Sequence, residues 1–219
     1  MTLDGTNTYV AAGWAIDPGP DDEAHLTAIL AAAGGELAGV ALTHAHPDHS
    51  DGAARLAELA GGVVIAAPAG DGAVGPFRSV ATPGHAPDHV CLLLGDVCFA
   101  GDLVMGHGSV FVGGEEGSLT AYLASLERIR ALAPAVLCPG HGPYVWDPPA
   151  KLDEYVAHRL DRERRLLAAL AAGARSTDDL LDRAWADAPA ALRPVAALTL
   201  AAHLDKLRAE GRLPDDMLD

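Results

Sequence analysis

The chain has 219 residues, half of them hydrophobic, and a formal net charge of −15 at pH 7. This length suits one domain with a small appendage, and the hydrophobic share argues against an intrinsically disordered chain. No apolar run reaches the ~18–20 residues of a membrane span, and MTLDGTNTYV lacks the basic and apolar regions of a secretory signal.

The acidic charge is concentrated in the first two thirds of the chain. Residues 1–150 contain 17 Asp/Glu against 4 Lys/Arg, whereas residues 151–219 contain 13 against 11. An acidic body repels polyanions, so nucleic acid is a disfavoured partner. The three cysteines are odd in number and form no CxxC pair, which predicts free thiols and a cytoplasmic location.

Strands and helices are predicted to alternate in the first half. TNTYVAAGWAID reads as strands, EAHLTAILAAAGG as a helix that ends at two glycines, and LAGVALT as a buried strand. HSDGAARLAELA reads as a helix and GVVIAAP as another buried strand. FRSVATPGH contains a strand, and HVCLLLGDVCFAGDLV contains two strands joined at Gly95 and Asp96.

The second half is predicted to be mainly helical. LTAYLASLERIRALAP is an amphipathic helix stopped by Pro134, and AVLCPGHGP is a short strand before a tight turn. PPAKLDEYVAHRLDRERRLLAALAAG is a long helix that stops at Gly173. STDDLLDRAW and RPVAALTLAAHLDKLRAEGRL predict two further helices.

Polar motifs follow four of the predicted strands: HAHPDH, PGH, GD and PGHG. Because loops at one end of a sheet carry function on a rigid platform, we expect these motifs to meet. Imidazole and carboxylate groups are typical ligands of zinc, iron and manganese. The candidate ligands are His44, His46, Asp48, His49, His85, Asp102 and His141. Pro47 divides the first four into two pairs, an arrangement that two ions about 3.5–4 Å apart would satisfy.

This set of motifs resembles the metallo-β-lactamase fold superfamily. THAHPDHSDG looks like its H-x-H-x-D-H signature, and TPGHAPDH, AGDL and PGHG resemble its later motifs, over about residues 5–146. The resemblance implies an α/β fold, an αββα sandwich. It also implies a first metal held by His44, His46 and His85, and a second held by Asp48, His49 and His141, with Asp102 bridging both.

The same resemblance implies a hydrolase. A hydroxide between the two ions would be the nucleophile, because metal binding lowers the pKa of water toward ~7. Asp48 would orient this hydroxide or pass a proton to the leaving group, and Asp102 would hold the two ions together. We expect zinc as the metal, with manganese or iron as alternatives, and a small molecule as the substrate.

The C-terminal segment carries a second resemblance. EYVAHRLDRERRLLAAL and AAHLDKLRAEGRL are similar to the winged-helix segment of lactamase-beta-2-like hydrolases, and TLDGTNTYV and IDPGPDDEAHL also look like that subgroup. We therefore expect a metal-binding catalytic domain over 1–149 and a small helical winged-helix-like domain over 150–219, with a minimal wing. The subgroup usually has a stretch before TLDGTNT, so either the true start lies upstream or the first sheet lacks an edge.

Several residues outside the ligand set have two interpretations. His89 either orients His85 or simply begins an element, and His107, in a glycine-rich loop, is a candidate substrate-binding residue. Cys138 is expected to be a buried structural thiol. Three histidines lie among charges on predicted helices and are expected to be solvated: His25, His158 and His203.

HRLDRERR contains four arginines within seven residues, namely Arg159, Arg162, Arg164 and Arg165. They could contact phosphate or RNA. We favour a helix face on which they pair with Asp161 and Glu163 at spacings of three and four. The acidic body and the negative balance of the tail support this second interpretation.

The sequence leaves four functions open. We favour a dinuclear metal hydrolase that acts on a small thioester or ester, because the body is acidic. The alternatives are an RNA phosphodiester hydrolase, a mononuclear-iron oxygenase of thiols or persulfides, and a non-enzymatic winged-helix nucleic-acid binder. The complete second ligand set argues against the oxygenase. No membrane partner is expected, and the sequence specifies no oligomeric state.

Overall fold

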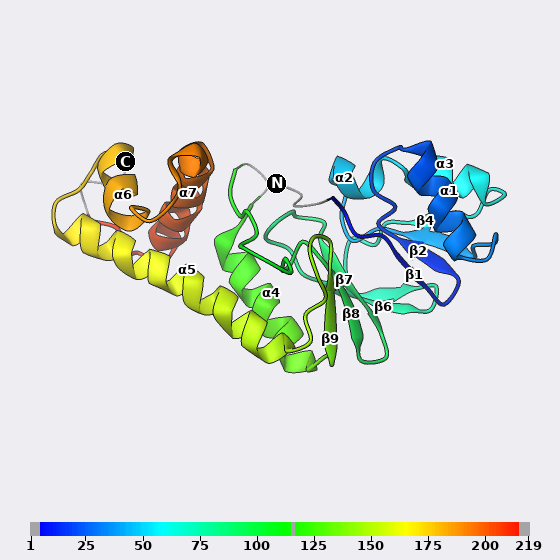
Figure 1. The fold of residues 1–219 in the computed structure, drawn as a ribbon. Coiled ribbons are helices and arrows are strands. Elements are labelled where there is room, and N and C mark those ends of the chain that lie inside the picture. Colours follow the sequence, from blue (N-terminus) through cyan, green and yellow to red (C-terminus); the bar gives the residue numbers. More distant parts are fainter. Residues whose placement is uncertain (1–4, 115–116, 215–219) are drawn as a thin grey trace.

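The computed structural model describes residues 5–114 and 117–214. Two sheets with helices beside them form the body, and one long helix leads from the body to a helical tail (Figure 1). The predicted αββα sandwich with a helical C-terminal domain is therefore confirmed.

The first sheet has the strand order β1-β2-β3-β4. Its strands are β1 (Tyr9–Ala11), β2 (Trp14–Ile16), β3 (Gly39–Ala41) and β4 (Val64–Ala66). β1 pairs with β2 in the antiparallel sense, and the other two pairings are parallel. The connecting helices are α1 (Glu23–Ala32), α2 (Pro47–Ser50) and α3 (Ala53–Leu59). The parallel pairing brings the carboxyl ends of β2 and β3 to the same sheet edge, where polar loops begin.

The second sheet has the strand order β5-β6-β7-β8-β9. Its strands are β5 (Gly72–Val74), β6 (Phe77–Ala81), β7 (Val90–Leu94), β8 (Val97–Gly101) and β9 (Val136–Pro139). β7 and β8 are the predicted hairpin, and β8 pairs with β9 in parallel. Strand β5 was not expected from the sequence; its pairing with β6 makes it a strand. Helix α4 (Leu119–Leu132) covers this sheet.

Three hydrophobic clusters fill the spaces between the four layers. Trp14, Phe77 and Phe99 lie in the cluster between the two sheets. Leu26 and Leu56 pack from α1 and α3 against the outer face of the first sheet. The third cluster lies between the second sheet and helices α4 and α5 (Pro148–Ala171). Because each fully buried large apolar side chain contributes roughly 1.5–3 kcal/mol, these layers fix the loops at their edges.

The tail consists of helices with their own core. They are α5 (Pro148–Ala171), α6 (Thr177–Ala184), the short η1 (Ala190–Leu192) and α7 (Arg193–Ala209). Helix α5 belongs to both units, since Leu152 packs in the body core and Leu166 in the tail core. The domain boundary at 149/150 stays a prediction. The described part of the tail contains no strand, and no described helix has both the length and the apolarity to cross a membrane.

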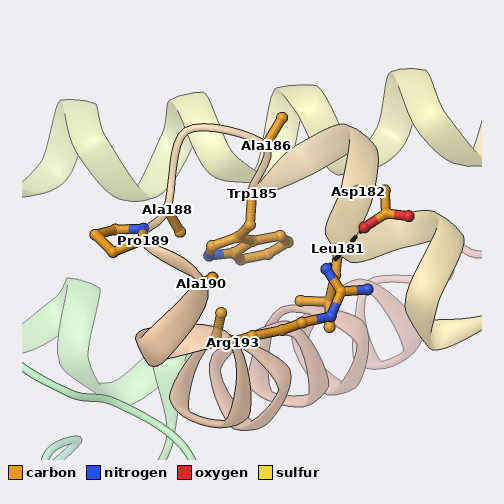
Figure 2. Close-up of a pocket in the computed structure, with 9 residues that line it drawn as sticks. Leu181, Asp182, Trp185, Ala186, Ala188, Pro189, Ala190 and Arg193 are labelled. Carbon is orange, nitrogen blue, oxygen red and sulfur yellow. Dashed lines mark hydrogen bonds and ion pairs between the residues drawn. The ribbon is translucent and has the colours of Figure 1, made fainter.

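A cavity of about 300 Å³ lies within this tail (Figure 2). Trp185 lines it, and the Arg193–Asp182 ion pair, with a separation of 2.7 Å, lies at the same cavity. All of its lining residues come from α6, the segment after it and α7. The cavity is therefore separate from every predicted metal ligand.

Three predictions about burial were wrong, and they concern β4, His203 and His25. GVVIAAP forms β4, but Val64 is 57% exposed and Ile65 is 40% exposed, because β4 is the last strand of its sheet. His203 is fully buried rather than solvated, and its ring packs against Trp185 at 5.6 Å between centroids. His158 is exposed as expected, whereas His25 is partly buried beside the Thr8 hydroxyl.

Candidate metal centre

The seven predicted ligand side chains meet where strands of both sheets end. His44 and His46 follow β3, and Asp48 and His49 lie on the short helix α2. The other three follow strands of the second sheet: His85 after β6, Asp102 after β8 and His141 after β9. Among the described residues, the potential ligand atoms form three groups. Within each group, all of these atoms lie within 4.8 Å of one another.

The first group consists of three histidines. Nδ1 of His46 lies 3.0 Å from Nε2 of His44 and 2.9 Å from Nε2 of His85. Burial lowers the pKa of His44 and that of His85. Both rings are therefore neutral at physiological pH, the protonation state that metal binding requires.

The second group consists of Asp48, His49 and His141. Oδ2 of Asp48 lies 3.4 Å from Nε2 of His141 and 3.8 Å from Nε2 of His49. Asp48 is the most exposed of the three, with a side chain that is 36% exposed, whereas the histidines are buried. The carboxylate of Asp48 can therefore reach both the ligand cluster and solvent.

Asp102 lies between these two groups. Its Oδ1 is 3.5 Å from Nε2 of His49 and 3.4 Å from Nε2 of His141, whereas its Oδ2 is 3.6 Å from Nε2 of His85. Each carboxylate oxygen thus faces a different group. His44, His49 and Asp102 also form the third group of converging ligand atoms.

The charges around Asp102 favour a cation. Burial raises the pKa of this carboxyl, but the nearby imidazoles of His141 and His49, 3.4 Å and 3.5 Å from its Oδ1, hold it well below its usual range. Burial lowers the pKa of His49, but the nearby carboxylates of Asp102 and Asp17 raise it to about 10. Two carboxylates therefore stabilise positive charge at this point, whether a proton or a metal ion carries it.

Two buried atoms test whether these residues fit a metal. Nε2 of His49 and Oδ1 of Asp102 are buried and have no hydrogen-bond partner in the part of the chain that the structure describes. A buried polar atom without a partner costs about 1–3 kcal/mol. A cation between them would satisfy both atoms, and imidazole with carboxylate is the donor set of divalent transition metals. The seven candidate ligands are therefore suited to holding divalent metal ions.

Asp17 contacts one candidate ligand, His49, directly and a second, His44, through Thr43. It was not among the site residues predicted from the sequence. Its carboxylate accepts hydrogen bonds from the Thr43 N–H at 2.8 Å and the Thr43 hydroxyl at 2.7 Å, and it meets Nδ1 of His49 at 3.0 Å. The Thr43 hydroxyl also lies 3.0 Å from Nδ1 of His44. Both Nδ1 atoms are thereby engaged, which leaves each Nε2 for the ligand cluster. One signal existed: Asp17 is the last residue of a predicted strand segment.

His89 contacts Asp102 rather than hydrogen-bonding to His85. Its Nε2 accepts the backbone N–H of Asp102 at 3.0 Å, and its Nδ1 meets the Thr82 hydroxyl at 2.8 Å. Burial lowers the pKa of His89 to about 3, so the ring is a neutral acceptor. The partner of Nδ1 on His85 is instead the Phe111 carbonyl, at 2.8 Å.

Gly140 allows the close approach of two ligands. A Cβ at this position would lie 2.6 Å from Oδ1 of Asp102 and 2.6 Å from Cε1 of His49. Any other residue would push these side chains apart, which explains the glycine before His141.

His107 lies outside the ligand cluster. It is exposed and lines a hollow of about 320 Å³ together with Tyr144 and Lys151. The Gly106 N–H donates to the His141 carbonyl at 2.9 Å, so this hollow adjoins the loops of the candidate metal centre. Cys138 is buried in β9 and belongs to none of the ligand groups found among the described residues.

Comparison with protein families agrees with this geometry. The family described as "Metallo-beta-lactamase superfamily" matches residues 69–141, and "Beta-lactamase associated winged helix domain" matches residues 176–217. The chain is 31% identical to Beta-lactamase-like protein 2 homolog of Drosophila melanogaster, over 97% of this chain and 85% of that protein.

Two fungal relatives are longer than this chain. Lactamase-like protein adaB of Aspergillus niger is 38% identical over 78% of this chain, and the alignment spans 60% of that protein. Atrochrysone carboxyl ACP thioesterase of Aspergillus fumigatus is 34% identical over 78% of this chain and 45% of its own length. The chain thus matches less than two thirds of either relative.

Solved structures share the fold. A metallo-beta-lactamase family protein of Thermus thermophilus superposes with a TM-score of 0.73 at 22% identity, over 93% of this chain and 88% of that one. TTHA1623 in a di-iron-bound form has a TM-score of 0.58 at 27% identity, over 67% of this chain and 93% of its own. The motif order, the layers and these relatives agree: the chain belongs to the metallo-β-lactamase superfamily, among the β-lactamase-like protein 2 homologues that its sequence resembles.

Proposed function

We propose that this chain is a two-metal hydrolase that cleaves a small thioester. The observation that carries the proposal is the position of Asp102, whose two oxygens face different ligand groups at 3.4–3.6 Å. A single-metal site does not need a carboxylate between two sets of ligands. Zinc is the proposed metal, because histidine and carboxylate donors suit it, and iron remains an alternative.

When bound, the two cations would supply Lewis acidity and lower the pKa of a water molecule. His44, His46 and His85 would hold one ion, Asp48, His49 and His141 the other, and Asp102 both. Asp48 is the residue placed to move a proton, because its carboxylate is partly exposed. His107 lines the adjoining hollow and would contact the acyl or thiol part of the substrate.

The thioester preference rests on one comparison with relatives and one argument about the leaving group. Thioesterase-named relatives align with 78% of this chain at 34% identity, one from Aspergillus fumigatus and one from Emericella nidulans. A thiol leaving group, with a pKa of about 8.5, departs as a thiolate without a strong general acid. This suits a site whose partly exposed carboxylate is its evident proton carrier.

RNA hydrolysis is the less favoured alternative, although a winged-helix family matches the tail. Many tail cations are already paired with carboxylates: Arg164 and Arg165 with Asp161, Lys206 and Arg212 with Glu163, and Arg193 with Asp178 and Asp182. Paired cations release few counterions on binding RNA, so they contribute little affinity. The same pairing weakens the proposal of a non-enzymatic nucleic-acid binder.

A cytoplasmic location also remains a proposal. Cys91, Cys98 and Cys138 are free and buried, which suits a reducing compartment. A substrate panel tests the proposed activity: short acyl thioesters with thiol release followed by a chromogenic disulfide, matched oxygen esters, and a labelled RNA. We expect thioester turnover that a chelator abolishes and zinc restores. Faster cleavage of RNA than of every thioester would refute the proposal.

A further inference from the structure

The segment from Leu103 to Phe111 connects two parts of the candidate metal centre, and we call residues 103–111 the bridge loop. It begins directly after Asp102, and its last carbonyl, that of Phe111, accepts a hydrogen bond from Nδ1 of His85 at 2.8 Å. The loop contains no helix or strand. Contacts from other parts of the chain must therefore hold it in place.

Two buried tyrosines hold the first part of the bridge loop. The hydroxyl of Tyr122, on α4, donates to the Leu103 carbonyl at 2.7 Å. The hydroxyl of Tyr155, on α5, accepts the Met105 N–H at 3.0 Å and donates to the Gly108 carbonyl at 2.9 Å. Burial raises the pKa of Tyr155 to about 12, so this hydroxyl keeps the proton that it donates.

Arg159, one turn further along α5, holds the last part of the loop. Its Nη2 donates to the Val110 carbonyl and, at 3.2 Å, to the Ser109 hydroxyl. Val110 directly precedes Phe111. The guanidinium therefore fixes the peptide unit next to the carbonyl that meets His85.

The burial of the Arg159 guanidinium is energetically unfavourable. Arg159 is 3% exposed, its Nε has no hydrogen-bond partner among the described residues, and no described carboxylate lies within ion-pair distance of it. A buried cation without a counter-charge destabilises a fold. The Tyr122 ring, 5.4 Å away, offsets part of this cost. Arg162 differs, because it forms an ion pair with Asp187.

We propose that Arg159 is a positioning residue which, together with Tyr155, holds the bridge loop so that the Phe111 carbonyl keeps His85 oriented for metal binding. An outer hydrogen-bond partner fixes the ring and the tautomer of a ligating histidine, and its loss typically costs about 10–100-fold in metal affinity. Here that partner is a backbone carbonyl, so the orientation of His85 depends on the side chains that hold the backbone in place. The inference rests on the proposed metal centre.

Zinc titration of Arg159→Met tests this role. The experiment uses the full chain in a His141→Ala background, so that the three-histidine group stays complete while the second group is impaired. The dissociation constant for Zn²⁺ is measured by competition with a chromophoric chelator, and the thermal midpoint of the metal-free protein is measured in parallel. Arg162→Met is the matched control, because Arg162 lies on the same helix but binds the Ala184 carbonyl and Asp187 in the tail.

We expect Arg159→Met to raise the Zn²⁺ dissociation constant about 10-fold or more, with a metal-free midpoint within about 5 °C of the parent. Arg159→Lys should lie in between, since an ammonium can reach one acceptor but lacks the planar fork. Arg162→Met should leave the constant unchanged. Should Arg159→Met fail to fold, Tyr155→Phe, which removes one hydroxyl, decides the question with the same expected direction.

An unchanged constant in the folded Arg159 variant, or an equal loss in Arg162→Met, would overturn the inference. These outcomes are separate from the fate of the proposed function. A wild-type protein that binds two Zn²⁺ ions but cleaves no thioester would refute the function and leave the positioning role intact.

Discussion

Replacing Asp17 with Asn should weaken metal binding without any change in the ligands themselves. The carboxylate accepts hydrogen bonds from the Thr43 N–H at 2.8 Å and from its hydroxyl at 2.7 Å, and it lies 3.0 Å from Nδ1 of His49. An amide keeps only one accepting oxygen. If that oxygen faces the Thr43 N–H, the NH₂ group faces Nδ1 of His49, donor against donor, and favours the tautomer with its proton on Nε2.

The size of the effect follows from these contacts. A hydrogen bond to a charged group contributes about 1.5–3 kcal/mol. The ring with its proton on Nε2 cannot bind a metal through that atom until the proton moves. We therefore expect a loss of about 10–100-fold in affinity at the second ligand group. Because Thr43 also contacts His44, the first group should weaken by a smaller factor.

A chelator-competition titration with Zn²⁺ measures both affinities. Asp88→Asn is the matched control, because the Asp88 carboxylate accepts the Ala45 N–H at 2.9 Å and an amide oxygen can do the same. The control should bind Zn²⁺ like the wild type. Wild-type affinity at both ligand groups in Asp17→Asn would refute the reasoning.

Three further predictions follow from the site and the tail. Gly140→Ala should reduce zinc affinity in a chelator titration, because its Cβ would lie 2.6 Å from a ligand atom; an unchanged affinity would show that the loop can move aside. Asp48→Ala and His141→Ala should each reduce turnover below about a tenth of the wild-type rate and leave the circular dichroism spectrum intact; greater residual activity would contradict a two-metal mechanism. Burial lowers the pKa of His203 from 6.5 to about 4, so the unfolded chain binds a proton that the folded tail excludes. Stability conferred by the neutral ring is complete above the unfolded pKa and should fall by about 3 kcal/mol between pH 6.5 and 4. Urea titrations of the wild type and His203→Leu should show a shallower pH slope in the variant, and equal slopes would contradict this origin.

The candidate ligands could be predicted from the sequence because they lie in short motifs. His44, His46, Asp48 and His49 occupy one loop, so their spacing alone indicates a shared task. The residues that hold them could not be found in the same way. Asp17 lies 26 positions from its partner Thr43, and Arg159 lies 49 positions from Val110.

The arginines of HRLDRERR show the limit of local rules. Pairing at spacings of three and four is correct for Arg164 and Arg165, which both bind Asp161. It fails for Arg159 and Arg162, which are buried, because tertiary packing places one side of α5 against the body and the tail. The same packing buries His203, which looked solvated among its charged neighbours.

Metal content per chain is the measurement that tests the central claim most directly. The protein would be purified without a metal-affinity tag and examined by elemental analysis together with protein quantitation. The ligand geometry around Asp102 predicts about two divalent ions per chain, zinc above all. A single iron per chain would contradict the two-metal hydrolase and favour the oxygenase, in which only the three-histidine group holds a metal.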